Sequence, residues 1–194
     1  MKGLHDTICE TGRRLLAAGL VHGSAGNISV RHGDHVSITP SGIDYVGLEA
    51  ADIVTIDLAG AVVDGSRAPS SERAVHLEIY RGRPDVSAIV HTHSISATAL
   101  AAIGEPIPAF LVEAMVVLGG VVAVAPFRMT GTPELGVAAA RALGSGRAVL
   151  LQSHGAVAVG SSLDEARDRA FALEEVAKVY VHVLSMGREP LPLT

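Results

Sequence analysis

The sequence predicts an α/β fold, a single domain over residues 1–194 with a mostly antiparallel central sheet and helices packed on its faces. Two pairs of short β-prone segments, within 27–39 and 53–63, are each separated by a turn and are typical of β-hairpins. Apolar residues recur at helical spacing near both ends of the chain. With 48% hydrophobic and 18% charged residues, the chain can fill one buried core and does not have a disordered composition.

The first half of the chain carries two helical signals with strands between them. A helix begins near Leu4 and ends before Gly19, because glycine is the usual residue just past a helix end. Serine is a favourable N-cap, so a second helix is expected to begin at Ser70 or Ser71, with Glu72 in its first turn, and to end before proline 84. Strands are expected at 27–31, 35–39, 53–58 and 61–63.

The second half adds four strands and three helices. Strands are expected at 86–93, 121–124, 149–151 and 156–159, with a short helix at 95–102. Pro133 after Thr132 is typical of the first turn of a helix. Residues 162–165 form a capping box before a long final helix. The apolar residues of this helix recur at helical spacing and form a stripe along one face: Ala166, Ala170, Leu173, Ala177, Tyr180 and Leu184.

Composition excludes several classes of function. A net charge of −5 without a block of Lys and Arg argues against a nucleic-acid partner. The apolar stretch 107–127 is interrupted by Pro108, Glu113 and two glycines, so we interpret it as a buried helix end followed by a core strand, and we expect no membrane partner. Cys9 is the only cysteine, which excludes a disulfide within the chain and predicts a reducing, cytoplasmic compartment.

Three histidines form the strongest chemical signal. His91 and His93 stand two residues apart at the end of a buried strand, so both imidazoles should project from the same face. His154 stands in a similar place after the apolar run 149–151. Three neutral imidazoles suit zinc and leave a position open for substrate. The alternative is that these are ordinary histidines at strand ends; the other six histidines are interpreted as surface or packing residues.

A carboxylate and a set of loops could complete a site. Glu72 could move a proton beside a metal-bound oxygen, although a glutamate in a first helical turn is by default a dipole-matching residue. Small-residue loops occur at 23–27, 39–42 and 70–71. Their backbone amides and hydroxyls could form an uncharged cradle for a phosphate, although each loop alone is more often a plain turn.

Eight segments in order, GSAGNISVR, ITPSGIDY, PSSE, RPDVSAIVHTHS, IPAF, LGG, GTPELG and SHGAVAVG, resemble the class II aldolase/adducin family, and within it the fuculose-phosphate aldolases. The resemblance covers nearly the whole chain. It implies zinc held by His91, His93 and His154, with Glu72 as the catalytic acid/base. It also implies a cyclic homotetramer with active sites at subunit interfaces. The residues implied to bind the substrate phosphate are Gly26, Asn27, Ser41, Gly42, Ser70 and Ser71.

The activity that this resemblance implies is cleavage of L-fuculose 1-phosphate, or a similar ketose 1-phosphate, to dihydroxyacetone phosphate and an aldehyde through a metal-stabilised enediolate. Two tyrosines of the fuculose-phosphate branch are missing: one is expected after Ile107-Pro108-Ala109, the other in a C-terminal tail that is longer in that branch. Glu113 is the nearest candidate to replace the first, and a structural role for it is equally open.

Four alternatives remain. An aldolase for 5-deoxy- or methylthio-ribulose 1-phosphate would use the same residues with a smaller or more apolar aldehyde pocket. A ribulose-phosphate epimerase of the family has aspartate where Glu72 stands, and a related dehydratase lacks the Ser-Ser-Glu pattern. A non-catalytic interaction module, like the adducin head, lacks the zinc histidines; stoichiometric metal in purified protein separates it from an enzyme.

Overall fold

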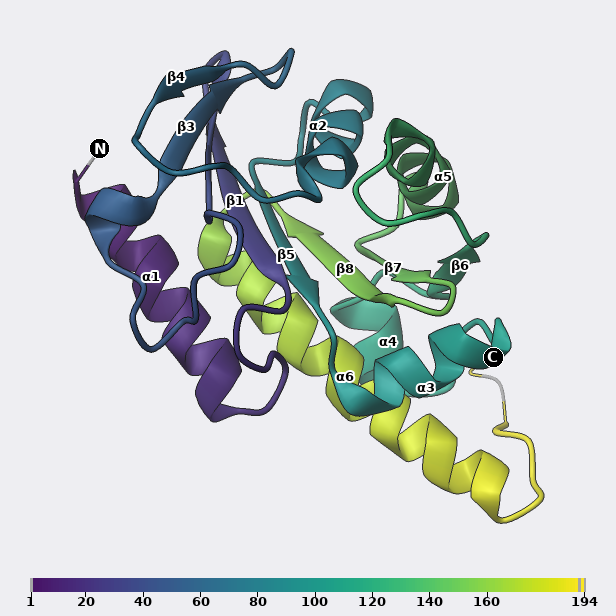
Figure 1. Ribbon diagram of the computed structural model, residues 1–194. Helices are drawn as coiled ribbons and strands as arrows, with labels where there is room; N and C mark the ends of the chain where they lie inside the picture. The colour runs from purple at the N-terminus through teal and green to yellow at the C-terminus, as the bar shows by residue number, and fades with distance from the viewer. Residues whose placement is uncertain (1, 192, 194) are drawn as a thin grey trace.

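A computed structural model describes residues 2–191 and 193, and it shows an eight-stranded mixed sheet with helices on both faces (Figure 1). The strand order is β4-β3-β2-β1-β5-β8-β7-β6, and every neighbouring pair is antiparallel except β6 and β7, which are parallel. The strands are β1 (Asn27–His32), β2 (His35–Ile38), β3 (Val54–Asp57), β4 (Val62–Asp64), β5 (Ala88–Thr92), β6 (Ala123–Ala125), β7 (Ala148–Leu151) and β8 (Gly155–Gly160). The expected α/β fold with a mostly antiparallel sheet is confirmed.

The helices form two layers, one on each face of this sheet (Figure 1). They are α1 (Lys2–Ala17), α2 (Arg73–Gly82), α3 (Ile95–Ile103), α4 (Val112–Val116), α5 (Pro133–Leu143) and α6 (Leu163–Ser185), with a short 3₁₀ turn at Ala50–Asp52. Helices α2 and α5 pack side by side on one face, and α1 and α6 cover the other, where α3 and α4 pack against α6. Alternation along β5 explains both layers, because Ile89 belongs to the α2–α5 core and Val90 to the α1–α6 core.

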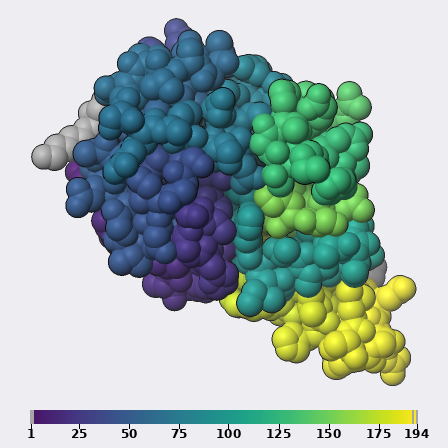
Figure 2. Space-filling view, in the orientation of Figure 1, coloured from purple at the N-terminus to yellow at the C-terminus, as the bar shows by residue number. Residues whose placement is uncertain are grey.

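The long final helix begins as the sequence predicts. The Ser162 hydroxyl accepts the backbone N–H of Glu165 at 3.2 Å, and the Glu165 carboxylate accepts the N–H of Ser161 at 2.7 Å. Its apolar stripe is buried as far as Tyr180, and the last turns protrude from the body of the molecule (Figure 2). Within the described residues, none of the helices combines the length and the apolar character needed to span a membrane.

Three expectations about element ends were wrong. Helix α2 begins at Arg73, so Glu72 is its N-cap residue, and the Ser70 hydroxyl accepts the N–H of Glu72 instead of capping the helix. Strand β5 ends at Thr92, because the backbone N–H of His93 leaves the ladder and donates to the carbonyl of Leu20 at 3.1 Å.

The third concerns the stretch 107–127. It contains the five-residue helix α4, two of whose valines, Val112 and Val116, are exposed, so this helix is not buried. A bridge between Ile107 and Val122 precedes the strand, which begins at Ala123 and is two residues later than expected.

Candidate metal centre

Glu72, His91, His93 and His154 converge on one point at the ends of the central strands β5 and β8. One ligand atom from each lies within 4.8 Å of the others. The three imidazole rings are nearly equidistant, with centroids 4.8 to 4.9 Å apart and edges facing one another. As the sequence led us to expect, these four residues lie together at one site. Their roles as metal ligands and proton carrier are a proposal.

Backbone geometry sets each imidazole in place. His91 is in register with Asn27 on β1 and with Val157 on β8, at the centre of the sheet. His154 lies in the tight turn between β7 and β8, where Ser153 has a φ of 57°, in the left-handed region that non-glycine residues rarely occupy. Gly155 leaves room for the rings, because a Cβ there would lie 2.4 Å from the carbonyl oxygen of Thr92.

The hydrogen bonding of His91 decides which of its nitrogens faces the site. Nδ1 lies 2.9 Å from the carbonyl oxygen of Ala156, which can only accept, so Nδ1 carries a proton. In the neutral ring Nε2 then has a free lone pair, and it lies 2.9 Å from Nε2 of His93. Burial, together with the neighbouring imidazoles of His91 and His154, lowers the pKa of His93 to about 4, so that ring is neutral at pH 7.

Glu72 faces the histidines from the start of α2. Its Oε2 lies 3.1 Å from His91 Nε2, and its Oε1 lies 3.0 Å from His154 Nε2. Burial raises the pKa of the carboxyl, but the adjacent imidazoles of His154 and His91 outweigh burial and hold that pKa well below its usual range. Oε1 is buried and, among the described residues, has no well-aligned hydrogen bond, although His154 Nε2 lies 3.0 Å away.

These residues fit a divalent cation. Two imidazole lone pairs 2.9 Å apart repel each other unless a proton or a cation lies between them. Three imidazole nitrogens and one carboxylate oxygen suit zinc or another first-row transition metal better than magnesium, which prefers oxygen ligands. The proton of His91 Nδ1 on a backbone carbonyl is also the usual outer arrangement of a metal-binding histidine.

The loops expected to form a phosphate cradle lie beside this group. Gly26 precedes Asn27 at the start of β1 with a φ of 78°, and a Cβ there would lie 2.6 Å from the carbonyl oxygen of His91. Only glycine lets this loop approach β5, the strand that carries His91, so closely. Asn27 is nearly buried, and its Nδ2 donates to Glu72 Oε2 at 2.9 Å.

Two further loops are joined to each other next to the start of α2. The N–H of Ser70 donates to the carbonyl of Thr39 at 3.1 Å, and the N–H of Ser41 donates to the carbonyl of Ala68 at 3.0 Å. Ser70 is buried, whereas Ser41, Gly42 and Ser71 are exposed. The tertiary structure thus brings all three predicted loops to one side of Glu72; phosphate binding by them is a proposal.

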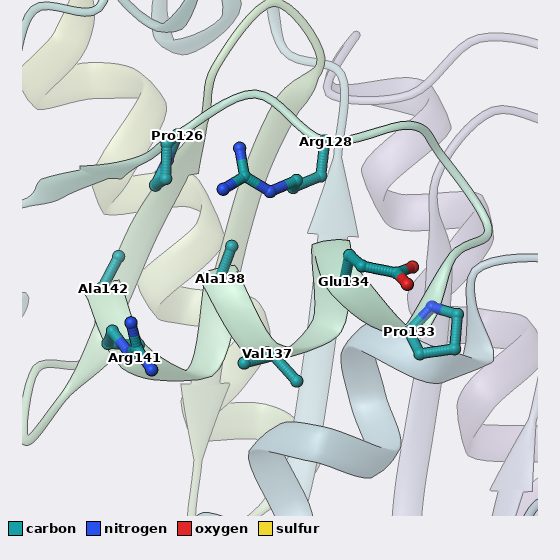
Figure 3. Close-up of a pocket in the computed structure, with 8 residues that line it drawn as sticks. All are labelled: Pro126, Arg128, Pro133, Glu134, Val137, Ala138, Arg141 and Ala142. Atoms are coloured by element: carbon teal, nitrogen blue, oxygen red, sulfur yellow. The ribbon is translucent and has the colours of Figure 1, made fainter.

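Three other features are not part of the group of four. Glu113 is exposed on α4 and is not part of the group of four. Phe110, the first residue after Ile107-Pro108-Ala109, is buried against Tyr180 with ring centroids 5.5 Å apart. A largely apolar cavity of about 430 Å³ lies over α5, between Pro126 and Arg141, and no residue of the metal centre lines it (Figure 3).

Sequence reasoning missed one residue of this site. His76 was interpreted as a surface or packing residue, yet it is fully buried, and its Nε2 donates to the side-chain oxygen of Asn27. Its position four residues after Glu72 was the available signal, because residues at i and i+4 of a helix share one face.

Comparison with known proteins gives consistent matches along the chain. Residues 6–181 match the family described as Class II Aldolase and Adducin N-terminal domain. A 5-methylthioribulose-1-phosphate/5-deoxyribulose-1-phosphate aldolase from Rhodospirillum rubrum is 40% identical over 190 residues, which cover 97% of this chain and 86% of the relative. An L-fuculose phosphate aldolase from Escherichia coli O6:H1 is 38% identical over 186 residues, which cover 96% of this chain and 86% of the relative.

Solved structures agree with these sequences. A structure described as L-fuculose 1-phosphate aldolase superimposes with a TM-score of 0.96 at 39% identity, covering 100% of this chain and 92% of the other. The L-fuculose-1-phosphate aldolase of Thermus thermophilus has a TM-score of 0.85 at 34% identity, covering 97% of this chain and 98% of the other.

Proposed function

Because this chain belongs to the class II aldolase and adducin N-terminal domain family, and is a class II aldolase of the fuculose-phosphate type, we propose that it is a zinc enzyme that cleaves L-fuculose 1-phosphate or a similar ketose 1-phosphate. The products would be dihydroxyacetone phosphate and an aldehyde. The observation that carries this proposal is the convergence of Glu72 with three imidazoles on one point.

His91, His93 and His154 would hold the cation. A bound divalent cation supplies Lewis-acid stabilisation of the negative charge that develops on a ketone oxygen. His91 is buried and His93 and His154 are half-buried, and the backbone contact of His91 and the turn at His154 fix these two rings before substrate arrives. Such preorganisation removes the need to rearrange ligands during the reaction.

Glu72 would move the proton at carbon. Cleavage breaks the carbon–carbon bond next to the ketone-bearing carbon pair: the hydroxyl of the leaving carbon gives up its proton to solvent and becomes the aldehyde, and the electron pair of the broken bond stays on the carbon beside the ketone. Glu72 takes up a proton from solvent and gives it to that carbon, which yields dihydroxyacetone phosphate. In the synthetic direction the carboxylate removes the same proton. Its contacts with His91 and His154 place it directly beside the cation site, where that carbon must lie for a proton transfer over hydrogen-bond distance.

The phosphate of the substrate would lie among Gly26, Asn27, Ser41, Gly42, Ser70 and Ser71. The N-terminus of α2, which follows Ser70 and Ser71, carries the positive end of a helix dipole, which favours a nearby anion. Binding of this remote group would hold the reacting carbons against the metal centre.

A second candidate substrate is 5-deoxyribulose 1-phosphate or its methylthio analogue. The specific observation in its favour is that relatives from Rhodospirillum rubrum and Bacillus thuringiensis, at 40% and 37% identity, carry these substrates in their names. The absence of a tyrosine from the segment after Ile107-Pro108-Ala109 would permit the smaller or more apolar aldehyde pocket that such a substrate needs.

A panel of ketose 1-phosphates and their phosphate-free counterparts tests the proposal. We expect fuculose 1-phosphate and other ketose 1-phosphates to be cleaved, and free ketoses to be very poor substrates, because the phosphate supplies remote binding energy. Release of dihydroxyacetone phosphate is the measured quantity. Equal turnover of free and phosphorylated fuculose would remove the phosphate assignment, and a strong preference for 5-deoxy or methylthio substrates would select the second candidate.

We also expect a homotetramer with active sites at subunit interfaces. Large apolar side chains are exposed between residues 95 and 121, among them Ile103, Val112 and Val116, each more than 60% exposed. An apolar patch of this kind is typical of a surface covered by another subunit. Light scattering should give about four times the 19.9 kDa mass of one chain. A monomer at working concentration that retains full activity would contradict this expectation.

A further inference from the structure

A chain of polar side chains runs from Glu72 into the core between β1 and α2. Asn27 Nδ2 donates to Glu72 Oε2 at 2.9 Å, and Asn27 Oδ1 is hydrogen-bonded to His76 Nε2. On its other side, His76 Nδ1 lies 2.6 Å from Ser29 Oγ, which lies 2.7 Å from the Tyr80 hydroxyl. Glu72, the proposed catalytic carboxylate, is thus the outermost member of this network, and the other four members are buried.

Two regular spacings produce this network. Asn27 and Ser29 stand two apart on β1, so their side chains share a face of the sheet. Glu72, His76 and Tyr80 stand four apart at and along α2, so they share a face of the helix. The strand and the helix present these faces to each other, and the side chains alternate between the two elements along the chain of hydrogen bonds.

Burial makes this network depend on its own members. His76 and Ser29 have no exposed surface, Tyr80 has 1% and Asn27 has 4%. A buried polar group that loses its partner costs about 1–3 kcal/mol, because water cannot replace the lost hydrogen bond. Each buried group must therefore act as the donor or the acceptor that its neighbour lacks.

These contacts allow one arrangement of protons. The Glu72 carboxylate can only accept, so the Asn27 amide presents its NH₂ group to Glu72 and its oxygen to His76. That oxygen can only accept, so His76 Nε2 carries a proton. Complete burial lowers the pKa of His76 to about 3, so the ring is neutral and Nδ1 accepts from the Ser29 hydroxyl. Ser29 in turn accepts from Tyr80, and every donor is directed toward Glu72.

We propose that His76 is a positioning residue for Glu72, which acts by fixing the orientation of the Asn27 side-chain amide. This inference rests on the proposed role of Glu72 in proton transfer. Without a donor at His76 Nε2, the Asn27 amide can rotate and present its oxygen to the carboxylate. Two acceptors would then face each other, and Glu72 would move away from the position in which it can reach the substrate carbon.

Two amide variants separate this role from simple packing. In His76→Gln, the side-chain NH₂ group can occupy the place of Nε2 and donate to Asn27. In His76→Asn, the shorter side chain reaches only the place of Nδ1, so it can contact Ser29 but not Asn27. Both variants put a neutral amide into the same buried position. They differ in the reach of that amide and not in its polarity, so a difference between them reports on the contact with Asn27.

We expect His76→Asn to lower kcat by about 10- to 100-fold, as is usual for residues that orient a catalytic group from outside, with KM changed by less than about threefold. His76→Gln should keep kcat within about fivefold of the wild type. Tyr80→Phe removes the hydroxyl at the far end of the chain of hydrogen bonds but leaves the Ser29 hydroxyl able to donate to His76. Its kcat should therefore differ from that of the wild type by less than about threefold. Metal content and the thermal unfolding temperature report on folding in each variant. In metal-free protein, the Asn27 side-chain amide resonances should shift in His76→Asn but not in His76→Gln.

A double-mutant cycle locates the effect. In a Glu72→Gln background, the difference between His76→Asn and His76→Gln should vanish, because the group they orient is absent. If that difference persists, or if both variants are equally active while Glu72→Gln is inactive, His76 does not act through Glu72 and the inference is overturned. Full activity of Glu72→Gln would instead overturn the proposed role of Glu72 itself.

Discussion

Replacement of His91, His93 or His154 by alanine is expected to abolish metal retention and aldol cleavage together. Each imidazole supplies one donor to the same point, and the centroids of the three rings are 4.8 to 4.9 Å apart. Among the described residues, loss of one ring leaves two imidazoles and the Glu72 carboxylate, which is the group proposed to carry the proton. Activity should fall below about 1% of the wild type, because the Lewis acid that stabilises developing charge is lost with the metal.

Stability gives an independent measure of the same loss. A metal that binds only the folded protein stabilises it by mass action, about 2.7 kcal/mol when the free metal is at 100 times its dissociation constant. Adding zinc to metal-free wild-type protein should therefore raise Tm, and the three alanine variants should show no such rise. His182→Ala, at an exposed histidine on α6, is the matched control and should keep both metal and activity. Any one of the three variants that keeps full zinc occupancy removes its residue from the ligand set.

Glu72→Gln is expected to keep the fold and the metal but to lose about 10²- to 10⁴-fold in kcat, the usual contribution of a general acid–base group. Glutamine has nearly the same shape and can still accept the hydrogen bond of Asn27, so the local structure should persist. Exchange of solvent deuterium into dihydroxyacetone phosphate requires only removal and return of the proton at carbon. That exchange should disappear in the same variant.

This substitution also separates two possible roles of the carboxylate. Glu72 belongs to the group of four donors, so it could serve as a metal ligand or as a proton carrier. Loss of metal from Glu72→Gln would indicate a ligand, whereas full metal content with lost exchange would indicate a proton carrier. Glu78→Gln, which changes a partly exposed glutamate on the same helix that pairs with Arg81, is the control and should leave activity unchanged. A loss under about fivefold in Glu72→Gln would argue that this residue has a structural role.

The sequence by itself determined the secondary structure and the positions of the metal-binding candidates. Helix starts at Thr132 and Ser162 and the hairpins of β1–β2 and β3–β4 follow from local caps, turns and spacing, and each is present in the structure. His91 and His154 were recognisable because a polar residue directly after a buried apolar run stands at a strand end. These signals depend on residues only a few positions apart, so they can be read from the sequence without knowledge of the fold.

Only the tertiary structure decided how these parts meet. The antiparallel register that pairs Asn27 with His91, far apart in the chain, puts the loop at 23–27 beside the strand that carries His91. The packing of α2 across β1 makes Glu72 the N-cap residue that faces the histidines, and it turns His76 from an expected surface or packing residue into a fully buried partner of Asn27. Strand order and helix docking depend on long-range burial of apolar faces, and local sequence does not encode which faces will meet.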